Sequence, residues 1–554
     1  MTVTRHEIRQ GAYYDSVVLM QLQRSLVQLD EVEDAGVVMA TQANRDVLTA
    51  AGFSLEGIEA KPDDLLIVVK SATEEQALAA IGKVDELLKS RRTTSTADFR
   101  PRSLDSAAKN LPEADWLLVS VPGRYAAGVA DEALDLGKHV FLYSDNVSIQ
   151  DEVKLKQKAS QLGLMVMGPD CGTAIINGVG LGFANHVNRG KIGLVGASGT
   201  GLQAITSAVH NLGGGVSQAI GTGGRDLKAD VGGITALQGL ELLGRDTETE
   251  IIVLVSKPPS PSVASKLLGA ASSTGKHVVV NFIGYPVSIE RVGNIPFASS
   301  LQGAAKIAVS LLGQKTSQPA APLKGYLRGL FSGGTLAYET LQSLHAFLSP
   351  MYSNIPITPD QKLPDSMHSQ GHVILDLGED EFTQGRLHPM MDNDLRIRRM
   401  WQEARDPETG IILLDVVLGE GAHPDPASEL VPAIKAIKAE HPVEFAALVI
   451  GTSEDPQDMG SQIAQLEQAG VQVFQEIASM ADYLVTRLST PYTFEGKPLD
   501  LSQFRDQFAA INVGLESFYD SIKSQGYEAV QVDWRPPAGG KEDLMAILAK
   551  MKKA

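Results

Sequence analysis

The stretch KIGLVGASGTGL at residues 191–202 predicts a strand, a turn and a helix, because an apolar run of strand length ends in a Gly-rich turn and is followed by a helical pattern. A second stretch, YLRGLFSGGTLA at residues 326–337, repeats this order of strand, turn and helix. Short continuous apolar runs are typical of strands buried on both faces of a parallel sheet. The two stretches therefore predict two α/β units of similar design.

Outward from these stretches, strands and helices alternate along most of the 554-residue chain. Further apolar runs of strand length begin at residues 65, 116, 139, 164, 251, 277, 411, 445 and 471. Helical patterns lie between them, for example at 126–137 and 463–470. Strand–helix–strand repetition predicts parallel sheets with right-handed crossovers. We therefore expect an α/β fold of consecutive doubly wound (Rossmann/flavodoxin-like) parallel-sheet domains.

The second and third of these domains read as diverged copies. In each copy the first helix is followed by a strand, a Gly-rich turn, a helix and then the pattern R-D-x-E-T before another strand, at residues 245–249 and 405–409. The alternative, that any two α/β units look alike, stays open. The predicted domains are 1–188, 189–314, 325–490 and a C-terminal arm, 491–554. Residues 89–103 are predicted to form a polar loop inside the first domain, and the Pro/Ser/Ala-rich stretch at 314–324 is predicted to be a linker before the third domain.

Composition narrows the classes of function. The net charge of −18 and the pI near 5.1 exclude a basic face for nucleic acid, but amide dipoles can still hold small anions in an acidic protein. With one cysteine, no disulfide forms within the chain, and a cytosolic location is compatible. No apolar stretch is long enough for a membrane span, and the N-terminus lacks a signal-peptide pattern. We expect a cytoplasmic protein that does not bind membranes.

Two Gly-rich turns, one near the end of the first predicted domain and one near the start of the second, are candidate anion sites. Ligands of open parallel sheets bind beyond the carboxyl ends of the strands, where helix N-termini present free N–H groups. One turn, 168-GPDCGTAI, contributes Pro169, Asp170 and Cys171. The other, 196-GASGTGLQ, contributes Ser198, Gly199 and Thr200. An ordinary Ser/Thr helix cap is the alternative explanation of the second turn.

A third turn, 221-GTGGRDLKADVGG, places Gly223 and Gly224 before Arg225 and Asp226. The Arg225 guanidinium suits a carboxylate or phosphate. A local pair between Arg225 and Asp226 that merely holds the loop is the alternative.

The fourth turn is the third-domain counterpart of these. Its candidate residues are Ser332, Gly333, Gly334 and Thr335, with Arg386, His388 and Asp392 in the loop 385-GRLHPMMD. His388 is suited to act as a nucleophile, a proton shuttle or an anion binder, and solvent exposure is the alternative.

Two further residues, His423 and Cys171, are weaker candidates for a functional role. His423 follows a strand with Asp415 and Glu420 near it in sequence. Cys171 is more consistent with a buried or capping thiol than with a nucleophile. The sequence has no phosphate-binding P-loop and no metal-ligand spacing, so we predict no metal site.

The order of these turns resembles the α subunit of succinyl-CoA synthetase. That family has a GPNCPG-like turn, an SRSGT-like turn and a D-P-x-T-E-x-I-V strand entry. The whole chain, including INVGL at 511–515, VDWRPPAGG at 532–540 and RLHPMMD at 386–392, is identified as a member of the FdrA family, which comprises acyl-CoA synthetase-like relatives of that enzyme.

The resemblance implies both a function and departures from the synthetase. The Gly-rich CoA turn is replaced by 10-QGAYYDSVVLMQL, and the stretch 281–301 lacks the active-site histidine. No cofactor is therefore certain; coenzyme A stays possible, and phosphate is expected as a substrate. FdrA-like proteins resemble a subunit of oxamate carbamoyltransferase, which converts oxalurate and phosphate to oxamate and carbamoyl phosphate during allantoin and purine nitrogen catabolism. The implied partners are a small anionic metabolite and other subunits, of the DUF1116 and DUF2877 types.

Three functions remain open. The chain is a subunit of an acyl- or carbamoyl-transferring enzyme, a subunit of an ADP-forming acyl-CoA ligase, or a non-catalytic scaffold that binds a metabolite. Under the first, the two S-G-T-type helix N-termini hold phosphate, Arg225 or Arg386 binds the substrate carboxylate, and His388 and Asp392 lie at the reacting group.

Overall fold

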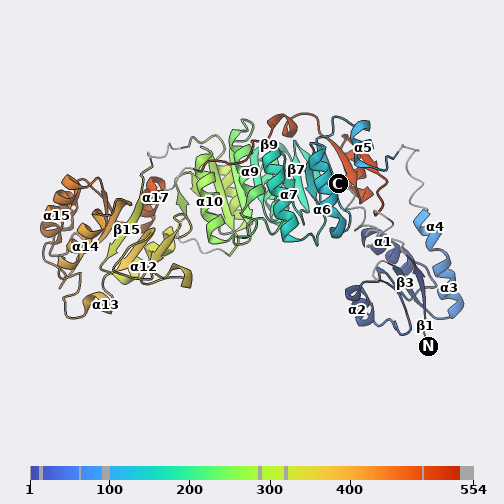
Figure 1. Cartoon of the computed structure of the whole chain (residues 1–554), viewed down its shortest axis with the longest axis horizontal. Helices are drawn as coiled ribbons and strands as arrows, with labels where there is room; N and C mark the ends of the chain where they lie inside the picture. Colours follow the sequence, from blue (N-terminus) through green and yellow to red (C-terminus); the bar gives the residue numbers. More distant parts are fainter. Residues whose placement is uncertain are drawn as a thin grey trace, which may run out of the picture. The chain divides into compact units, whose positions relative to one another are not determined.

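The computed structural model describes residues 2–10, 16–61, 64–89, 100–284, 290–316, 322–488 and 492–536. Most of the polar loop, part of the linker, and the Pro-Pro-Ala-Gly-Gly segment with the Lys-rich C-terminus lie outside the described residues. The chain divides into two compact units, one of residues 1–155 with 507–554 and one of residues 156–506 (Figure 1).

The first unit begins with a small antiparallel sheet. Its elements are β1 (Val3–Arg9), α1 (Ser16–Val27), β2 (Asp34–Met39), α2 (Gln42–Ala50), β3 (Leu65–Ser71), α3 (Glu74–Gly82) and α4 (Val84–Lys89). The strand order is β1-β3-β2, and both outer strands run antiparallel to β3. The strand predicted from residue 65 is present as β3, but an antiparallel sheet is not the start of the doubly wound domain expected over 1–188.

The rest of the first unit is a parallel sheet built from two distant parts of the chain. Its elements are α5 (Leu104–Asn110), β4 (Trp116–Val119), α6 (Gly123–Asp135), β5 (His139–Leu142), β21 (Ala509–Val513), α18 (Glu516–Ser524) and β22 (Glu528–Val532). β21 pairs in parallel with both β4 and β22, and β4 pairs in parallel with β5. The segment expected to be a C-terminal arm over 491–554 therefore supplies two strands to this sheet.

The second domain opens the second unit and has a mostly parallel sheet. Its elements are α7 (Ile149–Leu162), β7 (Thr173–Ile176), β8 (Val179–Gly182), β9 (Arg189–Gly196), α8 (Gly199–Asn211), β10 (Val216–Gly221), α9 (Ile234–Arg245), β11 (Ile251–Ser256), α10 (Pro261–Ser273), β12 (His277–Phe282) and α11 (Leu301–Ser310). The strand order is β12-β11-β9-β10-β7-β8, with an antiparallel edge at β7 and β8. A core of Ile, Leu and Val side chains lies between the central strands and α8 and α11.

The third domain has a fully parallel six-stranded sheet. Its elements are β15 (Tyr326–Phe331), α12 (Gly334–Leu344), β16 (Met351–Ser353), β17 (His372–Asp376), α13 (Asp380–Thr383), α14 (Asp394–Ala404), β18 (Thr409–Val417), α15 (Pro426–Glu440), β19 (Glu444–Ile450), α16 (Met459–Gln468), β20 (Val471–Phe474) and α17 (Ile477–Leu488). The strand order is β16-β17-β15-β18-β19-β20; the five strands β17-β15-β18-β19-β20 follow the flavodoxin-like order, and β16 adds a strand at the edge. The expected doubly wound α/β class is confirmed.

The central part of the strand order is the same in the second and third domains, which agrees with the expected duplication. β9 lies between β10 and β11 as β15 lies between β17 and β18. In both copies the aspartate of R-D-x-E-T accepts a hydrogen bond from the backbone two residues on, Asp246 from Glu248 and Asp406 from Glu408. This motif is therefore a structural turn that leads into β11 and β18.

No helix among the described residues is long and apolar enough to cross a membrane.

Candidate functional site

Three of the four predicted turns meet, and two of them, at 196 and 221, follow the carboxyl ends of the second-domain strands β9 and β10. A Cβ on Gly223, whose φ is +83°, would lie 2.3 Å from the carbonyl oxygen of Pro169, so the third turn lies directly on the first. A Cβ on Gly199 would lie 3.6 Å from Oγ1 of Thr173, which brings the second turn to the same place. The structure thus brings together the turns that begin at residues 168, 196 and 221.

The N-terminus of α8 is open toward this meeting point. Ser198 is the N-cap, and its Oγ accepts a hydrogen bond from the backbone of Gly201 at 3.2 Å. Gly199 is half-buried and Thr200 is exposed. Neither of their backbone N–H groups has an acceptor among the described residues. The helix therefore presents two donors and the positive end of its dipole, as anion-binding helix termini do.

The loop between β10 and α9 is held differently from either prediction. Asp226 is fully buried and pairs with Lys156 of α7, with 2.8 Å between Nζ and Oδ1. It also accepts from the backbone of Thr235 and Ala236 in the first turn of α9. Lys156 is thus a cationic partner of Asp226 that neither the anion-binding prediction for Arg225 nor the alternative of a local Arg225–Asp226 pair includes. Sequence reasoning missed Lys156, for which no local pattern exists.

The first turn contributes a carboxylate but no reactive thiol. Asp170 is exposed and has a φ of +57°. Cys171 is buried, and burial raises the pKa of its thiol to about 12. A thiol with that pKa is not a thiolate near neutral pH, so the interpretation of Cys171 as a buried structural residue is confirmed.

The N-terminus of α12, the third-domain counterpart of α8, is closed. Asp415 of β18 accepts from the backbone of Ser332 at 2.7 Å and of Gly333 at 2.8 Å, and the Ser332 hydroxyl donates to both of its carboxylate oxygens. Ser332 is buried, with 1% of its surface exposed. The prediction that Ser332 and Gly333 hold phosphate is therefore wrong, because a carboxylate of the protein already takes these donors.

A second carboxylate lies beside the same terminus. A Cβ on Gly334 would lie 2.4 Å from Oδ2 of Asp376, at the end of β17. Burial is the main reason that the pKa of Asp376 is raised, and the charges of Glu379 and Asp415 add to the effect. Asp415 is held in addition by Arg396 of α14, with Nη1 2.9 Å from Oδ1. Two acidic groups next to Gly334 and the exposed Thr335 make this terminus unfavourable for a further anion.

The loop that carries His388 lies near Asp376. His388 Nδ1 accepts from the backbone of Met390 at 3.2 Å. Its Nε2 and Oδ1 of Asp376 each lie about 3 Å from the place of a Cβ on Gly378, and the His388 charge lowers the pKa of Asp376. This arrangement suits transfer of a proton at Nε2.

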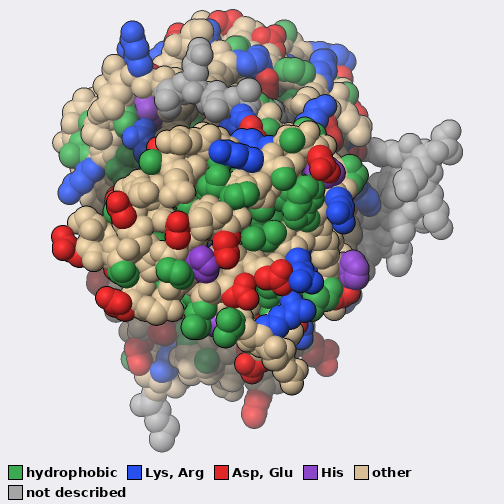
Figure 2. Space-filling view, turned by 90° about the vertical axis from the view of Figure 1, so that its left-hand side faces the viewer, with side chains coloured by type: hydrophobic (Ala, Val, Ile, Leu, Met, Phe, Trp, Pro, Cys, Tyr) green, Lys and Arg blue, Asp and Glu red, His purple; other side chains and the backbone are tan. Residues whose placement is uncertain are grey.

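The other predicted residues of that loop have different surroundings. Asp392 accepts from the backbone of Asp394 at the start of α14, and Arg386 is exposed. The exposed fractions of Leu387 and Met391 are 60% and 50%. Figure 2 shows acidic, basic and histidine side chains mixed with apolar ones on the face that it draws.

His423, the weaker candidate, connects to the same loop. Its backbone N–H donates to the carbonyl of Met390 at 2.8 Å, and its Nε2 lies 3.2 Å from a carboxylate oxygen of Glu429. Among the described residues, no hydrogen bond or ion pair joins the His388 group to the second-domain turns. The predicted site residues therefore form two groups, one around α8 and one around α12.

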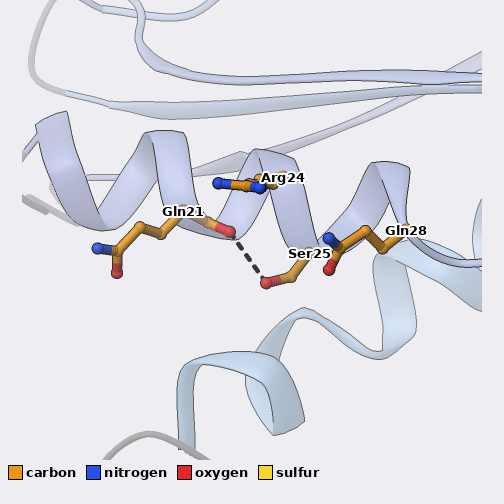
Figure 3. A pocket seen from close by; sticks show the side chains of 4 residues that line it. All are labelled: Gln21, Arg24, Ser25 and Gln28. Atoms are coloured by element: carbon orange, nitrogen blue, oxygen red, sulfur yellow. Dashed lines mark hydrogen bonds between the residues drawn. The ribbon is translucent and has the colours of Figure 1, made fainter.

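The first unit contains a polar pocket of about 480 Å³ on α1. Figure 3 shows its lining side chains, Gln21, Arg24, Ser25 and Gln28, along one side of the helix. Ser25 Oγ donates to the carbonyl of Gln21 at 2.9 Å. None of the residues predicted from the sequence to form a site lines this pocket.

The fold defines the class of this protein, an α/β protein of doubly wound parallel-sheet domains. The CoA-ligase family matches residues 330–482, the CoA binding domain matches 187–284, and the AllF heavy metal-associated domain matches 1–102. The CoA-binding match begins at residue 187 and covers most of the predicted second domain, whereas the family resemblance implies a CoA-binding-like domain at 1–188 and a ligase-CoA-like domain at 189–314.

Relatives place the chain in a family. It is 42% identical to YahF of Escherichia coli K12 over 84% of this chain and 94% of that protein. The chain belongs to the FdrA family, whose relatives resemble the succinyl-CoA synthetase α subunit. It is also 30% identical to a succinate–CoA ligase (ADP-forming) α subunit of Archaeoglobus fulgidus, over 26% of this chain and half of that one. A dinucleotide-forming acetyl-coenzyme A synthetase of Ca. Korarchaeum cryptofilum aligns over 67% of this chain and 82% of its own, with 15% identity and a TM-score of 0.29.

The heavy metal-associated match does not bring a metal site with it. The single cysteine of the chain is Cys171, so residues 1–102 contain no thiol ligand for a soft metal. Among the described residues, no group of three His, Cys, Asp or Glu side chains is placed to hold an ion. The residues of this domain therefore do not fit the metal that its family description implies.

Proposed function

We propose that this chain is a subunit of an enzyme that transfers an acyl or carbamoyl group to or from phosphate, and that its specific reaction is that of oxamate carbamoyltransferase. In this reaction oxalurate and phosphate give oxamate and carbamoyl phosphate. The match of residues 1–102 to an AllF domain supports a place in allantoin nitrogen catabolism.

The open N-terminus of α8 is the observation that carries the proposal. Gly199 and Thr200 present two backbone donors without acceptors among the described residues, beside two further Gly-rich turns. Donors fixed in the fold stabilise an oxyanion without the cost of reorienting solvent, and this is usually the largest single catalytic contribution. In this proposal these donors bind phosphate.

The chemistry needs a phosphate site, a carboxylate site and a proton route. A phosphate oxygen attacks the ureido carbonyl carbon of oxalurate, the bond from that carbon to the inner nitrogen breaks, and the nitrogen leaves as oxamate after taking the phosphate's proton. Arg225 is the proposed partner of the substrate carboxylate, because a guanidinium binds carboxylates with two parallel hydrogen bonds. His388, with Asp376 near its Nε2, belongs to the group around α12, and its proposed role as carrier of the proton requires that group to reach the α8 terminus during the reaction.

A second function is favoured by one specific finding. The CoA binding domain matches 187–284, which includes the open terminus of α8, and succinate–CoA ligases are among the relatives. The same two donors fit a phosphate of coenzyme A. The alternative proposal is therefore a subunit of an ADP-forming acyl-CoA ligase.

One set of assays separates these functions. The full chain is tested alone and with proposed partner subunits of the DUF1116 and DUF2877 types. Carbamoyl phosphate formed from oxalurate and phosphate supports the first proposal. ADP formed only with coenzyme A, ATP and a short carboxylic acid supports the second. Thermal stabilisation by oxalurate or phosphate without turnover indicates a metabolite-binding scaffold and contradicts both.

The role of His388 is tested by His388→Ala. We expect turnover to be lost while the melting temperature changes little, because the side chain is half-buried in a surface loop. Full activity in this variant would remove His388 from the reaction and leave the α8 site untouched.

A further inference from the structure

A fully buried ion pair stands behind the open terminus of α8. Lys156 and Asp226 both have 0% of their side chains exposed, with 2.8 Å between Nζ and Oδ1. Burying two charges costs several kcal/mol per ion before they attract each other, and a well-packed apolar pair is often as stable. The pair is therefore better explained by a role in holding one particular conformation than by its contribution to stability.

The pair fixes both ends of one loop. At the start of the loop, Lys156 Nζ donates to the carbonyl oxygen of Thr222 at 2.9 Å. At its end, Asp226 receives the charge of Lys156 and accepts from the backbone of Ala236 in α9 at 2.9 Å. A single ammonium group thus ties the residues that bracket Gly223, Gly224 and Arg225.

The bracketed residues have little freedom to move. Gly223 packs so closely on Pro169 that a Cβ there would lie 2.3 Å from its carbonyl oxygen. A Cβ on Gly224 would lie 3.8 Å from Oδ2 of Asp170. A shift of this loop would therefore also displace the turn at 168–173, whose residues Gly172 and Thr173 lie next to Gly199 of α8.

We infer that Lys156 is a positioning residue for the anion site of the second domain, acting through its bonds to Thr222 and Asp226 rather than by contact with the ligand. The inference rests on the proposed function, since that function supplies the phosphate. Nothing in the local sequence of α7 marks Lys156 out, because its partners lie 66 and 70 residues away along the chain.

The test measures binding of inorganic phosphate to the full chain by calorimetry and the amide exchange of residues 221–226. The variants are Lys156→Met and the double variant Lys156→Met with Asp226→Asn. The control is Arg505→Met, which breaks another ion pair of the domain, that with Asp246 before β11. Asp246 lies before the N-terminal end of β11, whereas the turns at 196 and 221 follow the C-terminal ends of β9 and β10.

We expect both Lys156 variants to lose phosphate affinity by about tenfold or more, as displaced binding groups do, and their loop amides to exchange faster. The double variant should recover unfolding stability, because no buried carboxylate is left unpaired, without recovering affinity. Arg505→Met should bind phosphate as the native chain does.

Two results overturn the inference in distinguishable ways. Native affinity in the double variant would show that Lys156 only neutralises Asp226, and would leave the phosphate site standing. A native chain that does not bind phosphate would remove the proposed phosphate site, and the positioning role with it.

Discussion

The N-termini of α8 and α12 occupy the same place in two copies of one fold, yet one is open and the other is closed. At α8 the donors of Gly199 and Thr200 have no acceptor among the described residues. At α12 the backbone donors of Ser332 and Gly333, the two residues before the helix, are taken by Asp415, and Asp376 lies beside Gly334. The backbone motif is shared, and its neighbours decide whether it is available to a ligand.

The difference traces to two positions on the adjacent strands. Counting from the shared R-D-x-E-T motif, Asp415 of β18 stands where β11 has Val255. In the paired strands, Asp376 lies opposite Phe331 as Gly221 lies opposite Gly196. A glycine and a valine thus flank the open terminus, and two aspartates flank the closed one. The two copies share the fold, and the different side chains at these two positions give the two helix N-termini different surroundings.

The largest expected effect comes from removing the carboxylate that closes α12. Asp415→Asn leaves Arg396 buried without its ionic partner, and we expect a loss of about 3–5 kcal/mol in the free energy of unfolding. Urea denaturation measures it. The control is Asp170→Asn at the open terminus, where an exposed side chain should change stability by less than about 0.5 kcal/mol. Equal costs for the two substitutions would mean that charge does not close α12.

The second expected effect is on binding and uses matched threonines. Thr200 and Thr335 are both the second residue of their helix and both are exposed. Proline is tolerated in the first turn and removes one N–H donor; α10 and α15 already begin with proline.

Thr200→Pro should therefore weaken phosphate binding by about 1.5–3 kcal/mol, the value of a hydrogen bond to a charged group, or roughly ten- to a hundredfold. Thr335→Pro should leave affinity within about twofold of the native value, a change of about 0.4 kcal/mol. Calorimetry with inorganic phosphate checks both. A larger loss from Thr335→Pro than from Thr200→Pro would reverse the comparison.

The third effect uses the first residue of each helix. A Cβ on Gly334 meets Oδ2 of Asp376 at 2.4 Å, whereas a Cβ on Gly199 has its nearest neighbour at 3.6 Å. Gly334→Ala should cost about 1–3 kcal/mol of stability by overpacking. Gly199→Ala should add about 0.4–1 kcal/mol by restricting the unfolded chain. The melting temperatures of the two variants, measured by thermal unfolding, test this prediction. Similar melting temperatures would indicate that Asp376 does not crowd the N-terminus of α12.

Much of the fold could be predicted because its signals are local. The strands expected at residues 65, 116, 191, 251 and 411 are all present, as continuous apolar runs require. The pairing partners could not be predicted. β21 joins β4 across nearly 400 residues of sequence, and β3 forms an antiparallel sheet although its own sequence resembles that of the parallel strands.

The candidate site was predictable only in part, for the same reason. The Ser, Gly and Thr residues of the turns are a local pattern, but the group that closes α12 comes from 83 residues further along the chain. One signal was present: Asp415 interrupts an otherwise apolar strand, at the position where the other copy has Val255. An alignment of the two copies would have identified Asp415. No comparable difference in the sequence identifies Lys156.

The smallest expected effect is a pH dependence that belongs to the closed terminus alone. Because burial raises the pKa of Asp376 above its unfolded value, its contribution to stability is complete below the ordinary carboxyl pKa of about 3.9 and is lost as pH rises through the folded pKa. Asp376→Asn keeps an oxygen that can accept from Gly378. We therefore expect this variant to be more stable than the native chain at pH 7, and the difference to shrink as pH falls toward 4. Urea midpoints at several pH values measure it, with Asp392→Asn as the control. A variant that is less stable at pH 7 would show that Asp376 is ionised and held by a cationic partner, and the closed terminus would then be a place for positive charge.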